Sequence, residues 1–517
     1  MSADTAFRPE TAPARERFVQ LLHAEWTKFR TVRGWVIGLI TAALITVLVG
    51  LLGPAGSSFA CVGRNGEPCT EHVPPLGPGG EPVTDSLYLV HQPLVGDGSL
   101  TVRVTSLTAS YPDDQAPEGD ALQPWSKAGI ILKNGTGQGS AYAAVMVTGG
   151  NGVRMQSDYT HDIAGRPGTV SSAAPRWLRL TRSGATITGE ESADGARWST
   201  VGTTDLAGLP STVEAGLFVA SPGYNVTTSK SFGGSSSEGG PTLATALFDH
   251  AGLQGLAPRG TWTGDALGDQ PRQAGFHPVG DGLAVSGSGD VAPLVIGQGS
   301  LSKTIENGLV GAFAGLIAVI VVATTFFTAE YRRGMIRTTL AASPRRGRVL
   351  AAKTVVIGSV TFVTGLVAAA VSVAVVAKLE RDKGLYLFPV PTLTEVRVVA
   401  GTAALLAVAA VLALAVGTAM RRSAGAVTTV IVALVLPYVL AVSTHLPASA
   451  SQWLLRFSPA AAFSIMQSLP QYPQVAAGYT PADGYFPLSP WGGFAVLCGY
   501  TALALGLAFH LLRRRDA

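Results

Sequence analysis

Six uninterrupted apolar runs divide the chain, and each predicts a helix that can cross a bilayer. A hydrocarbon core requires about 20 apolar residues in helical form. The first run meets that length marginally and the second meets it fully. The runs cover residues 36–52, 309–328, 354–377, 398–419, 424–442 and 491–512. The pattern predicts an α-helical polytopic membrane protein, with transmembrane helix 1 at 35–53 and transmembrane helices 2 to 6 within 308–517.

The first apolar run resembles a signal peptide in length, but its flanks favour a retained anchor. About 35 residues precede it, and no small-x-small cleavage site follows cleanly at its end. Residues 1–34 are therefore expected to form a cytoplasmic tail.

Between the first two runs, in residues 54–307, apolar and polar positions alternate with period two. Gly-rich or Asp-Gly turns separate the alternating segments. These segments are 100–107, 141–147, 177–182, 185–190 and 214–220. Many short strands at such spacing predict an all-β sandwich. Residues 233–240 (GGSSSEGG) are expected to form a flexible linker or a long loop.

Composition agrees with this division of the chain. The 517 residues are 47% hydrophobic and only 14% charged, whereas soluble domains carry roughly a quarter charged residues. The composition excludes a purely cytosolic enzyme, a disordered protein and a fibrous repeat.

Basic residues predict the orientation, because they concentrate in cytoplasmic loops. They cluster before the first span, between the second and third, between the fourth and fifth, and after the sixth. The clusters are Lys28, Arg30 and Arg33; Arg332, Arg333, Arg337, Arg345, Arg346, Arg348 and Lys353; Arg421 and Arg422; and Arg513, Arg514 and Arg515. With six spans all four clusters fall on one side, so both termini are predicted to be cytoplasmic and residues 54–307 extracytoplasmic. The loop at 378–397, with basic residues outside, is the exception.

The six spans carry no Asp, Glu, Lys or Arg away from their ends. Intramembrane ionisable residues mark proton relays and ion paths. Their absence argues against a channel or an ion-coupled carrier, and favours a passive-walled path driven from elsewhere.

Two cysteines, Cys61 and Cys69, flank a short loop rich in turn-forming residues. Because disulfides persist outside the cell, we expect a Cys61–Cys69 bridge; two free thiols are the alternative. Cys498 lies in the sixth span and is interpreted as packing. This spacing predicts no metal site.

Apolar residues recur at helical spacing within residues 14–31, which predicts an amphipathic helix lying in the membrane interface. Its candidate interfacial residues are Glu25, Trp26, Lys28 and Arg30. An ordinary juxtamembrane anchor is the alternative. The string at 23–35, HAEWTKFRTVRGW, resembles the start of ABC-2-type transporter permeases, especially those of actinobacteria.

A second string, TAEYRRGMIRTTLAASPRRGRVLAAK at 328–353, resembles the signature of the same family. Gly334 permits a tight turn after the span, and Ser343-Pro344 stops the short helix that follows. The resemblance implies a coupling helix at about 329–345, seated in a groove of the nucleotide-binding subunit. Its candidate contacts are Glu330, Tyr331, Arg332, Arg333, Gly334 and Arg337. Alternatively, the charged residues pair with lipid phosphates or with each other, or only set the topology.

The resemblance implies a transport subunit rather than an enzyme. No Gly-x-x-x-x-Gly-Lys-Ser/Thr occurs in the chain, so ATP is expected on a separate ABC ATPase subunit, with no cofactor in this chain. Two permease chains, forming a homodimer or a heterodimer, would normally pair with two ATPases. The expected surroundings are the lipid bilayer of the cell membrane, and nucleic acid is not expected as a partner.

Segments of the β-rich region resemble concanavalin A-like jelly-roll domains. They are 125–132, 151–153, 175–184 and 192–198. Such domains often bind carbohydrate, and Trp198 and Tyr159 are the candidate glycan contacts, whereas Trp125 and Trp177 are expected in the core. A hydrolase would need two carboxylates across the bond, but Glu190, Glu191 and Asp194 approach a hairpin tip instead.

The leading hypothesis is the membrane-spanning permease subunit of an ABC-2-type exporter with a concanavalin A-like extracytoplasmic domain between helices 1 and 2. The alternative is a membrane-anchored glycan-binding or envelope-sensing protein without transport activity. An adjacent reading frame encoding a Walker-A ATPase would favour transport.

Overall fold

The computed structural model describes most of the chain as two compact units. The described residues are 18–56, 73–110, 122–229, 235–256, 261–296, 303–332, 334, 345–442, 446, 448–475, 479–481 and 484–515. The helical unit comprises residues 1–71, 301–470 and 479–517, and the β unit comprises 72–300 and 471–478. Cys61, Cys69, Arg333 and Arg337 lie outside the described residues.

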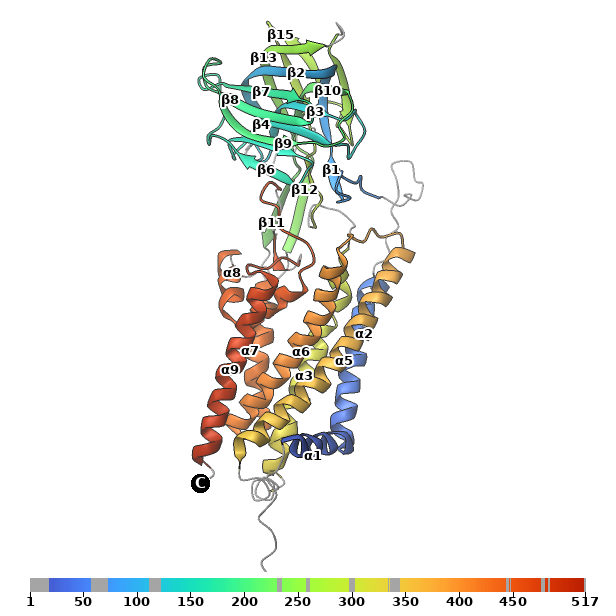
Figure 1. The fold of residues 1–517 in the computed structure, drawn as a ribbon, viewed down its shortest axis with the longest axis vertical. Coiled ribbons are helices and arrows are strands. Elements are labelled where there is room, and N and C mark those ends of the chain that lie inside the picture. The colour runs from blue at the N-terminus through green and yellow to red at the C-terminus, as the bar shows by residue number, and fades with distance from the viewer. Residues whose placement is uncertain are drawn as a thin grey trace, which may run out of the picture. The chain divides into compact units, whose positions relative to one another are not determined.

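The helical unit is built from long helices and short connecting ones (Figure 1). Its elements are α1 (Phe18–Thr31), α2 (Arg33–Gly56), η1 (Ile305–Leu309), α3 (Ala312–Arg332), α5 (Arg346–Asp382), α6 (Thr392–Met420), α7 (Ser423–Val442), α8 (Ala448–Phe457), η2 (Pro459–Met466) and α9 (Pro490–Arg515). Within the part of the chain that the structure describes, 6 helices are long and apolar enough to cross a membrane. The six predicted apolar helices are therefore confirmed. At 37 residues, α5 begins ahead of the apolar run and so includes Lys353.

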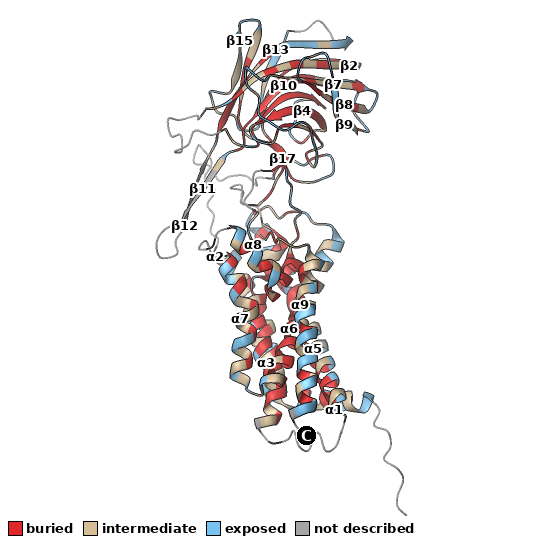
Figure 2. Ribbon diagram, turned by 90° about the vertical axis from the view of Figure 1, so that its left-hand side faces the viewer, coloured by how far each residue is buried: buried red, intermediate tan, exposed pale blue. Residues whose placement is uncertain are grey.

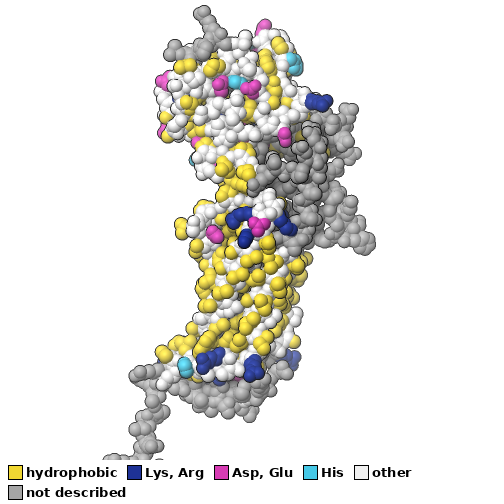
Figure 3. All heavy atoms as spheres, turned by 90° about the vertical axis from the view of Figure 1, so that its right-hand side faces the viewer, with side chains coloured by type: hydrophobic (Ala, Val, Ile, Leu, Met, Phe, Trp, Pro, Cys, Tyr) yellow, Lys and Arg dark blue, Asp and Glu magenta, His cyan; other side chains and the backbone are white. Residues whose placement is uncertain are grey.

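Helix α6 forms the centre of the helical unit, with 72% of its apolar window buried against 22% for α2 and α9. Figure 2 shows buried positions facing inward and exposed ones on the outer faces of the helices. Large apolar side chains are exposed along α2 and α5, including Ile40, Leu44, Val363 and Val367. On the face drawn in Figure 3, hydrophobic side chains cover the middle of this unit and Lys and Arg side chains lie at both of its ends, the pattern of a lipid-facing surface.

Helices α2 and α3 approach each other through small residues. A Cβ added at Gly311 would overlap the carbonyl oxygen of Thr46, and one added at Gly315 would overlap Thr46 Oγ1. A Cβ at Gly50 would come within 2.6 Å of the Gly308 carbonyl oxygen. Small residues four apart let membrane helices pack at close range, which explains why this sequence tolerates glycine inside apolar helices.

Gly315→Val is therefore expected to destabilise the helical unit by about 1–3 kcal/mol, because the added side chain meets the Thr46 hydroxyl and the Ala42 carbonyl oxygen on α2. Gly506→Val is the matched control, since an added Cβ at Gly506 in α9 meets nothing within 4 Å. Thermal unfolding of the detergent-purified chains measures the difference. Equal losses for both variants would contradict close α2–α3 packing.

The β unit consists of antiparallel strands that follow α2 and precede α3 in chain order. They are β1 (Val83–Asp85), β2 (Leu87–Ser110), β3 (Lys127–Lys133), β4 (Tyr142–Thr148), β5 (Val153–Ser157), β6 (His161–Ala164), β7 (Arg176–Ser183), β8 (Thr186–Ser192), β9 (Ser199–Asp205), β10 (Thr212–Ala220), β11 (Tyr224–Ser229), β12 (Ser235–Gly240), β13 (Leu243–Leu256), β14 (Thr263–Leu267), β15 (Gly275–Val279), β16 (Gly282–Gly287) and β17 (Val291–Pro293). Within the described residues, thirteen of them form one sheet whose main path runs β15-β16-β13-β2-β10-β3-β4-β5-β6.

The 24-residue strand β2 joins two layers of this sheet. Its first half pairs with β10 and β14, and its second half with β7 and β13. Strands β7, β8 and β9 lie over β3, β4 and β5. The close approach is seen at Gly189 on β8, where an added Cβ would meet the side chains of Met155 and Val145. The core between the layers includes Ile130, Val145, Leu180 and Ile187, all fully buried.

The five predicted alternating segments fall on β2, β4, β7, β8 and β10, which confirms the large antiparallel β domain. One local prediction is wrong. Residues 235–240, expected in a linker or a long loop, form β12 and pair in antiparallel register with β11. A Gly/Ser-rich composition does not prevent strand formation when a neighbouring strand supplies backbone partners.

Candidate functional site

Two carboxylates and two lysines from three helices meet inside the helical unit. Lys353 Nζ on α5 donates to Glu25 Oε2 on α1 and to Glu330 Oε1 on α3, both at 2.7 Å. Lys28 Nζ on α1 donates to Glu25 Oε1 at 2.9 Å and to Glu330 Oε1 at 3.2 Å. We call these four residues the ion cluster. The cluster links α1, α3 and α5.

Burial makes this arrangement energetically demanding. The side chain of Lys353 is 0% exposed and those of Glu25 and Glu330 are 3% exposed, whereas that of Lys28 is 40% exposed. A buried charge is tolerated when opposite charges and hydrogen bonds surround it. The two positive and two negative charges of the ion cluster balance, and their bonds join α1, α3 and α5.

Lys28 lies on α1, outside the candidate spans, and its pKa reports this balance. Burial lowers the pKa, but the hydrogen bond and charge of Glu25 and the charge of Glu330 raise it, and the net pKa is above the usual lysine value. Lys28 therefore stays protonated at neutral pH and keeps its bonds to both carboxylates.

Aromatic rings surround the ion cluster and hold α1 in place. Lys353 Nζ lies 4.6 Å from the ring centroid of Phe326. Phe29 and Trp35 pack edge-on against the same ring, at 5.7 and 5.0 Å between centroids. Figure 1 shows α1 running across the end of the helix bundle, where these contacts gather. Both ion pairs and ring packing therefore fix α1 to the bundle.

The ion cluster lies at the base of the expected coupling segment. Glu330 is in the last turn of α3 and Lys353 is near the start of α5. Gly334, between them, has φ of 69°, the left-handed conformation that glycine adopts freely, so the predicted tight turn is present. Residues 335–344, the body of the predicted coupling helix, lie outside the described residues.

The other candidate coupling residues differ in how far their side chains are buried and in whether the structure describes them. Tyr331 is half-buried, with the Arg421 guanidinium 5.2 Å from its ring centroid. Arg332 ends α3, but its side chain, like Arg333 and Arg337, is outside the described set. Glu330 is turned into the bundle and 3% exposed, so its carboxylate is already occupied by lysines of its own chain.

The predicted amphipathic helix is present as α1, and its polar residues divide between two faces. Trp26 is 42% exposed and stacks on Phe29, and Arg30 is exposed. Glu25 is not on that exposed face: it is 2% exposed and bonded to Lys353 and Lys28. The expectation that Glu25 lies in the interface is wrong, because its carboxylate is buried and bonds to Lys353 inside the bundle.

Sequence reasoning missed this pairing. The sequence places Lys353 only among the basic residues between the second and third spans, although its side chain is completely buried on α5. Glu25 and Lys353 are separated by 328 positions, and no local pattern connects them. The only available signal was compositional, since Glu25 and Glu330 are isolated acids among basic clusters.

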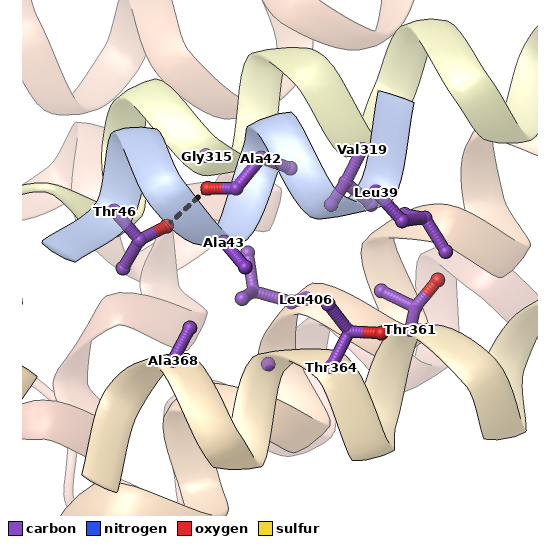
Figure 4. A pocket seen from close by; sticks show the side chains of 11 residues that line it. Leu39, Ala42, Ala43, Thr46, Gly315, Val319, Thr361, Thr364, Ala368 and Leu406 are labelled. Carbon is purple, nitrogen blue, oxygen red and sulfur yellow. Dashed lines mark hydrogen bonds between the residues drawn. The ribbon is translucent and has the colours of Figure 1, made fainter. Parts of the chain in front are cut away.

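A small void lies among α2, α3, α5 and α6 (Figure 4). It is lined by small and hydroxyl-bearing residues such as Ala42, Thr46, Thr361 and Thr364, and its volume is about 10 Å³. That volume holds a single water at most. Thr361 Oγ1 is buried there without a hydrogen-bond partner among the described atoms.

The candidate glycan contacts in the β unit have different environments. Tyr159 is fully buried and its hydroxyl donates to Asp85 Oδ2 at 2.7 Å. A ring without exposed surface cannot stack on a sugar, so that expectation is wrong. Trp198 is half-buried, with the Arg179 guanidinium 3.6 Å from its ring centroid, so one face is covered. Trp125 is buried, as expected, whereas Trp177, also expected in the core, is only half-buried.

The acidic residues near Trp198 form local structure. Asp194 accepts hydrogen bonds from the backbone N–H groups of Ala196 and Arg197, at 3.0 and 2.9 Å. Glu191 accepts one from Arg166 N at 2.7 Å. Asp194 therefore holds the hairpin turn, in agreement with the hairpin-tip interpretation, whereas Glu191 is buried on β8 and bonds to a residue 25 positions away. Among the residues that the structure describes, no group of three or more His, Cys, Asp or Glu could hold a metal ion.

Comparison with solved structures gives only low overall similarity. One is a functionally unknown protein from Saccharomyces cerevisiae, with 16% identity, coverage of 33% of this chain and 74% of that chain, and a TM-score of 0.21. Another is scytalido-glutamic peptidase with a transition state analog inhibitor, with 10% identity, coverage of 39% and 98%, and a TM-score of 0.24. At these TM-scores the similarities support no statement about this chain. No curated protein matches the sequence.

A family model, by contrast, identifies the family of this chain. The family model for ABC-2 family transporter proteins matches residues 144–517, more than half of the chain, and includes all of the helices from α3 onward. Together with the two motif strings and the six apolar helices, this match shows that the chain is a multi-pass membrane protein of the ABC-2 transporter family.

Proposed function

We propose that this chain is the membrane-spanning permease subunit of an ABC exporter, and that a separate ABC ATPase subunit binds and hydrolyses ATP. The observation that carries the proposal is the buried bond between Glu330 and Lys353 at the base of the coupling segment. Because this bond joins α3 to α5, a push on the segment between them moves both helices together. The bonds from Lys353 to Glu25 and from Lys28 to Glu330 extend that movement to α1.

In this proposal the coupling residues have two roles. Arg332, Arg333 and Arg337, with Tyr331 and Gly334, form the part of segment 329–345 that contacts the ATPase. Glu330 is a positioning residue, because its carboxylate is buried and bonded to Lys353 and Lys28. A partner subunit therefore acts on Glu330 through the segment, not by direct pairing.

The remaining features of the proposal concern topology and assembly. Both termini are cytoplasmic and residues 54–307 are extracytoplasmic, where Cys61 and Cys69 form a disulfide. The β unit is a concanavalin A-like module between the first two spans. Two permease chains, identical or different, assemble with two ATPase subunits. The basic clusters at 28–33, 345–353, 421–422 and 513–515 support this orientation.

Arg333→Ala combined with Arg337→Ala is expected to reduce recovery of the ATPase partner at least about tenfold when the tagged chain is purified from its native membranes, because charge-assisted contacts are lost. Mass spectrometry of the copurified proteins for a Walker-A ATPase gives the measurement. Arg381→Ala, an exposed residue in the last turn of α5, is the matched control.

Two outcomes would count against the proposal. Full recovery of the ATPase by the double variant would remove the coupling assignment. If the wild-type chain brings down no ATPase at all, a membrane-anchored glycan-binding or envelope-sensing protein becomes the better account.

A further inference from the structure

A cleft of about 450 Å³ opens on the β unit where β2 and β13 meet the turn between β15 and β16. Small-molecule sites commonly have volumes of about 300–1,000 Å³. Its lining combines the charged residues Arg103, Asp249 and Asp281 with apolar residues such as Val279 and Leu283. This mixture of polar and apolar lining fits a ligand that has both kinds of surface.

Arg103 and Asp249 form a fixed polar plate in this cleft. They are cross-strand partners on β2 and β13. Arg103 Nε donates to Asp249 Oδ1 at 2.7 Å, and Arg103 Nη2 donates to Oδ2 at 2.6 Å. This hydrogen bonding lowers the pKa of Asp249, so the pair stays ionised at neutral pH. The side chains remain 31% and 23% exposed, which leaves donor and acceptor positions for a ligand.

His250 is held beside this plate by an unusual backbone. It has φ of 52° and lies in an irregularity of β13 between Asp249 and Gly252. Bulges of this kind redirect side chains and cluster near functional sites. Its Nδ1 lies 3.2 Å from Asp249 Oδ1, its ring packs edge-on to Trp177 at 5.2 Å, and its side chain is 59% exposed.

Apart from His250, the ionised residues of the cleft sum to a net negative charge, which disfavours anions. Arg103 and Asp249 neutralise each other, and Asp281 adds a negative charge at the lining. A ligand for this site therefore carries no negative charge, offers several hydroxyl or amide groups, and has a C–H face for Val279 and Leu283. A saccharide ring has all three properties.

We propose that this cleft binds an uncharged saccharide unit, with Arg103, Asp249 and His250 hydrogen-bonding its hydroxyls. The proposal moves the expected carbohydrate contact away from Tyr159, which is buried, and Trp198, whose ring is covered by Arg179. It rests on the proposed extracytoplasmic placement of the β unit but not on coupling to an ATPase.

The test uses the full-length chain in lipid nanodiscs. Maltotriose, cellotriose and triacetylchitotriose are the probes, with trialanine as a peptide comparison, and binding is measured by calorimetry and saturation-transfer NMR. At least one trisaccharide is expected to bind, and His250→Gly to weaken that binding about tenfold, the size of one lost ligand hydrogen bond. Glycine adopts positive φ freely, so this variant keeps the backbone. Trp198→Ala is the control and should bind normally.

The proposal is overturned if the folded wild-type chain binds none of the three trisaccharides, or binds only trialanine. It is also overturned if His250→Gly binds as tightly as wild type, or if Trp198→Ala abolishes binding instead. ATPase copurification from the same preparation separates the two proposals. A chain that recovers the ATPase but binds no saccharide rejects the cleft alone, and one that binds saccharide without an ATPase rejects the transport assignment alone.

Discussion

Lys353→Met is expected to destabilise the helical unit by about 3–5 kcal/mol, because it leaves two buried carboxylates without their buried counter-charge. Lys353 bonds to both Glu25 and Glu330 and is itself 0% exposed. Methionine matches the length of the lysine stem, so the loss measures charge rather than packing. Thermal unfolding of the detergent-purified chain, followed by tryptophan fluorescence, reports the shift.

A triple variant separates charge imbalance from general damage. Glu25→Gln, Glu330→Gln and Lys353→Met together remove the three buried charges and leave only Lys28, whose side chain is 40% exposed, so most of the lost stability should return. Lys378→Met, an exposed position on α5, serves as the matched control and should stay within about 0.5 kcal/mol of wild type. If the single and triple variants are equally unstable, the ion cluster does not hold the helices as described.

The triple variant also tests the mechanical proposal. In this variant the amides introduced at positions 25 and 330 and the methionine side chain at position 353 cannot form the charged bonds by which Lys353 joins α1, α3 and α5. A chain that folds normally but loses ATPase-dependent transport would therefore indicate that the charged bonds transmit movement, beyond stabilising the helices.

Asp85→Asn is expected to destabilise the β unit by about 3–5 kcal/mol, because it leaves Lys133 buried without an opposite charge. Asp85 Oδ2 accepts hydrogen bonds from Lys133 Nζ, from the Tyr159 hydroxyl and from Gly139 N, at 2.7, 2.7 and 2.8 Å. Burial lowers the pKa of Lys133 even though Asp85 opposes that shift. Without Asp85 the pKa of Lys133 falls further, and the loss of stability should be greatest below that pKa, where the folded chain must hold the charged lysine in its buried position.

Hydrogen–deuterium exchange of the β3 and β4 backbone amides measures this effect within the full chain. Asp85→Asn should accelerate exchange there, and adding Lys133→Met should restore most of the protection by removing the unpaired charge. Arg197→Ala breaks an ion pair whose arginine side chain is 92% exposed, and exposed pairs contribute only about 0–1 kcal/mol. Comparable exchange in Asp85→Asn and Arg197→Ala would refute the importance of the buried pair.

A buried bond between a lysine and a carboxylate therefore stabilises both units, but it has different consequences in each. In the β unit, Lys133, Asp85 and Tyr159 belong to strands and loops of a single core, so their bonds fix one local arrangement. In the helical unit, Lys353 bonds residues on two other helices. In our proposal, the second arrangement also transmits movement between the helices.

The sequence alone determined the parts of this protein that depend on local patterns. Apolar run length gave the six membrane-length helices, and alternation gave the strands of the antiparallel sheet, because burial repeats with the period of each element. Gly334 was predicted at a turn for a similarly local reason, since its positive φ suits glycine. The two motif strings indicated the ABC-2 family, which the family match over 144–517 shows.

Only the tertiary structure decided which polar side chains are buried and what they bond. The sequence around Glu25 and Glu330 predicts exposed charges near a membrane surface, yet both carboxylates bond to Lys353 inside the bundle. Tyr159 is expected from the sequence to be an exposed platform for a sugar, but its hydroxyl bonds to Asp85. His250 owes its position to a local break in the β13 register. These outcomes depend on charge pairing and core packing between residues far apart in the chain. Hydrophobic periodicity carries no information about such contacts.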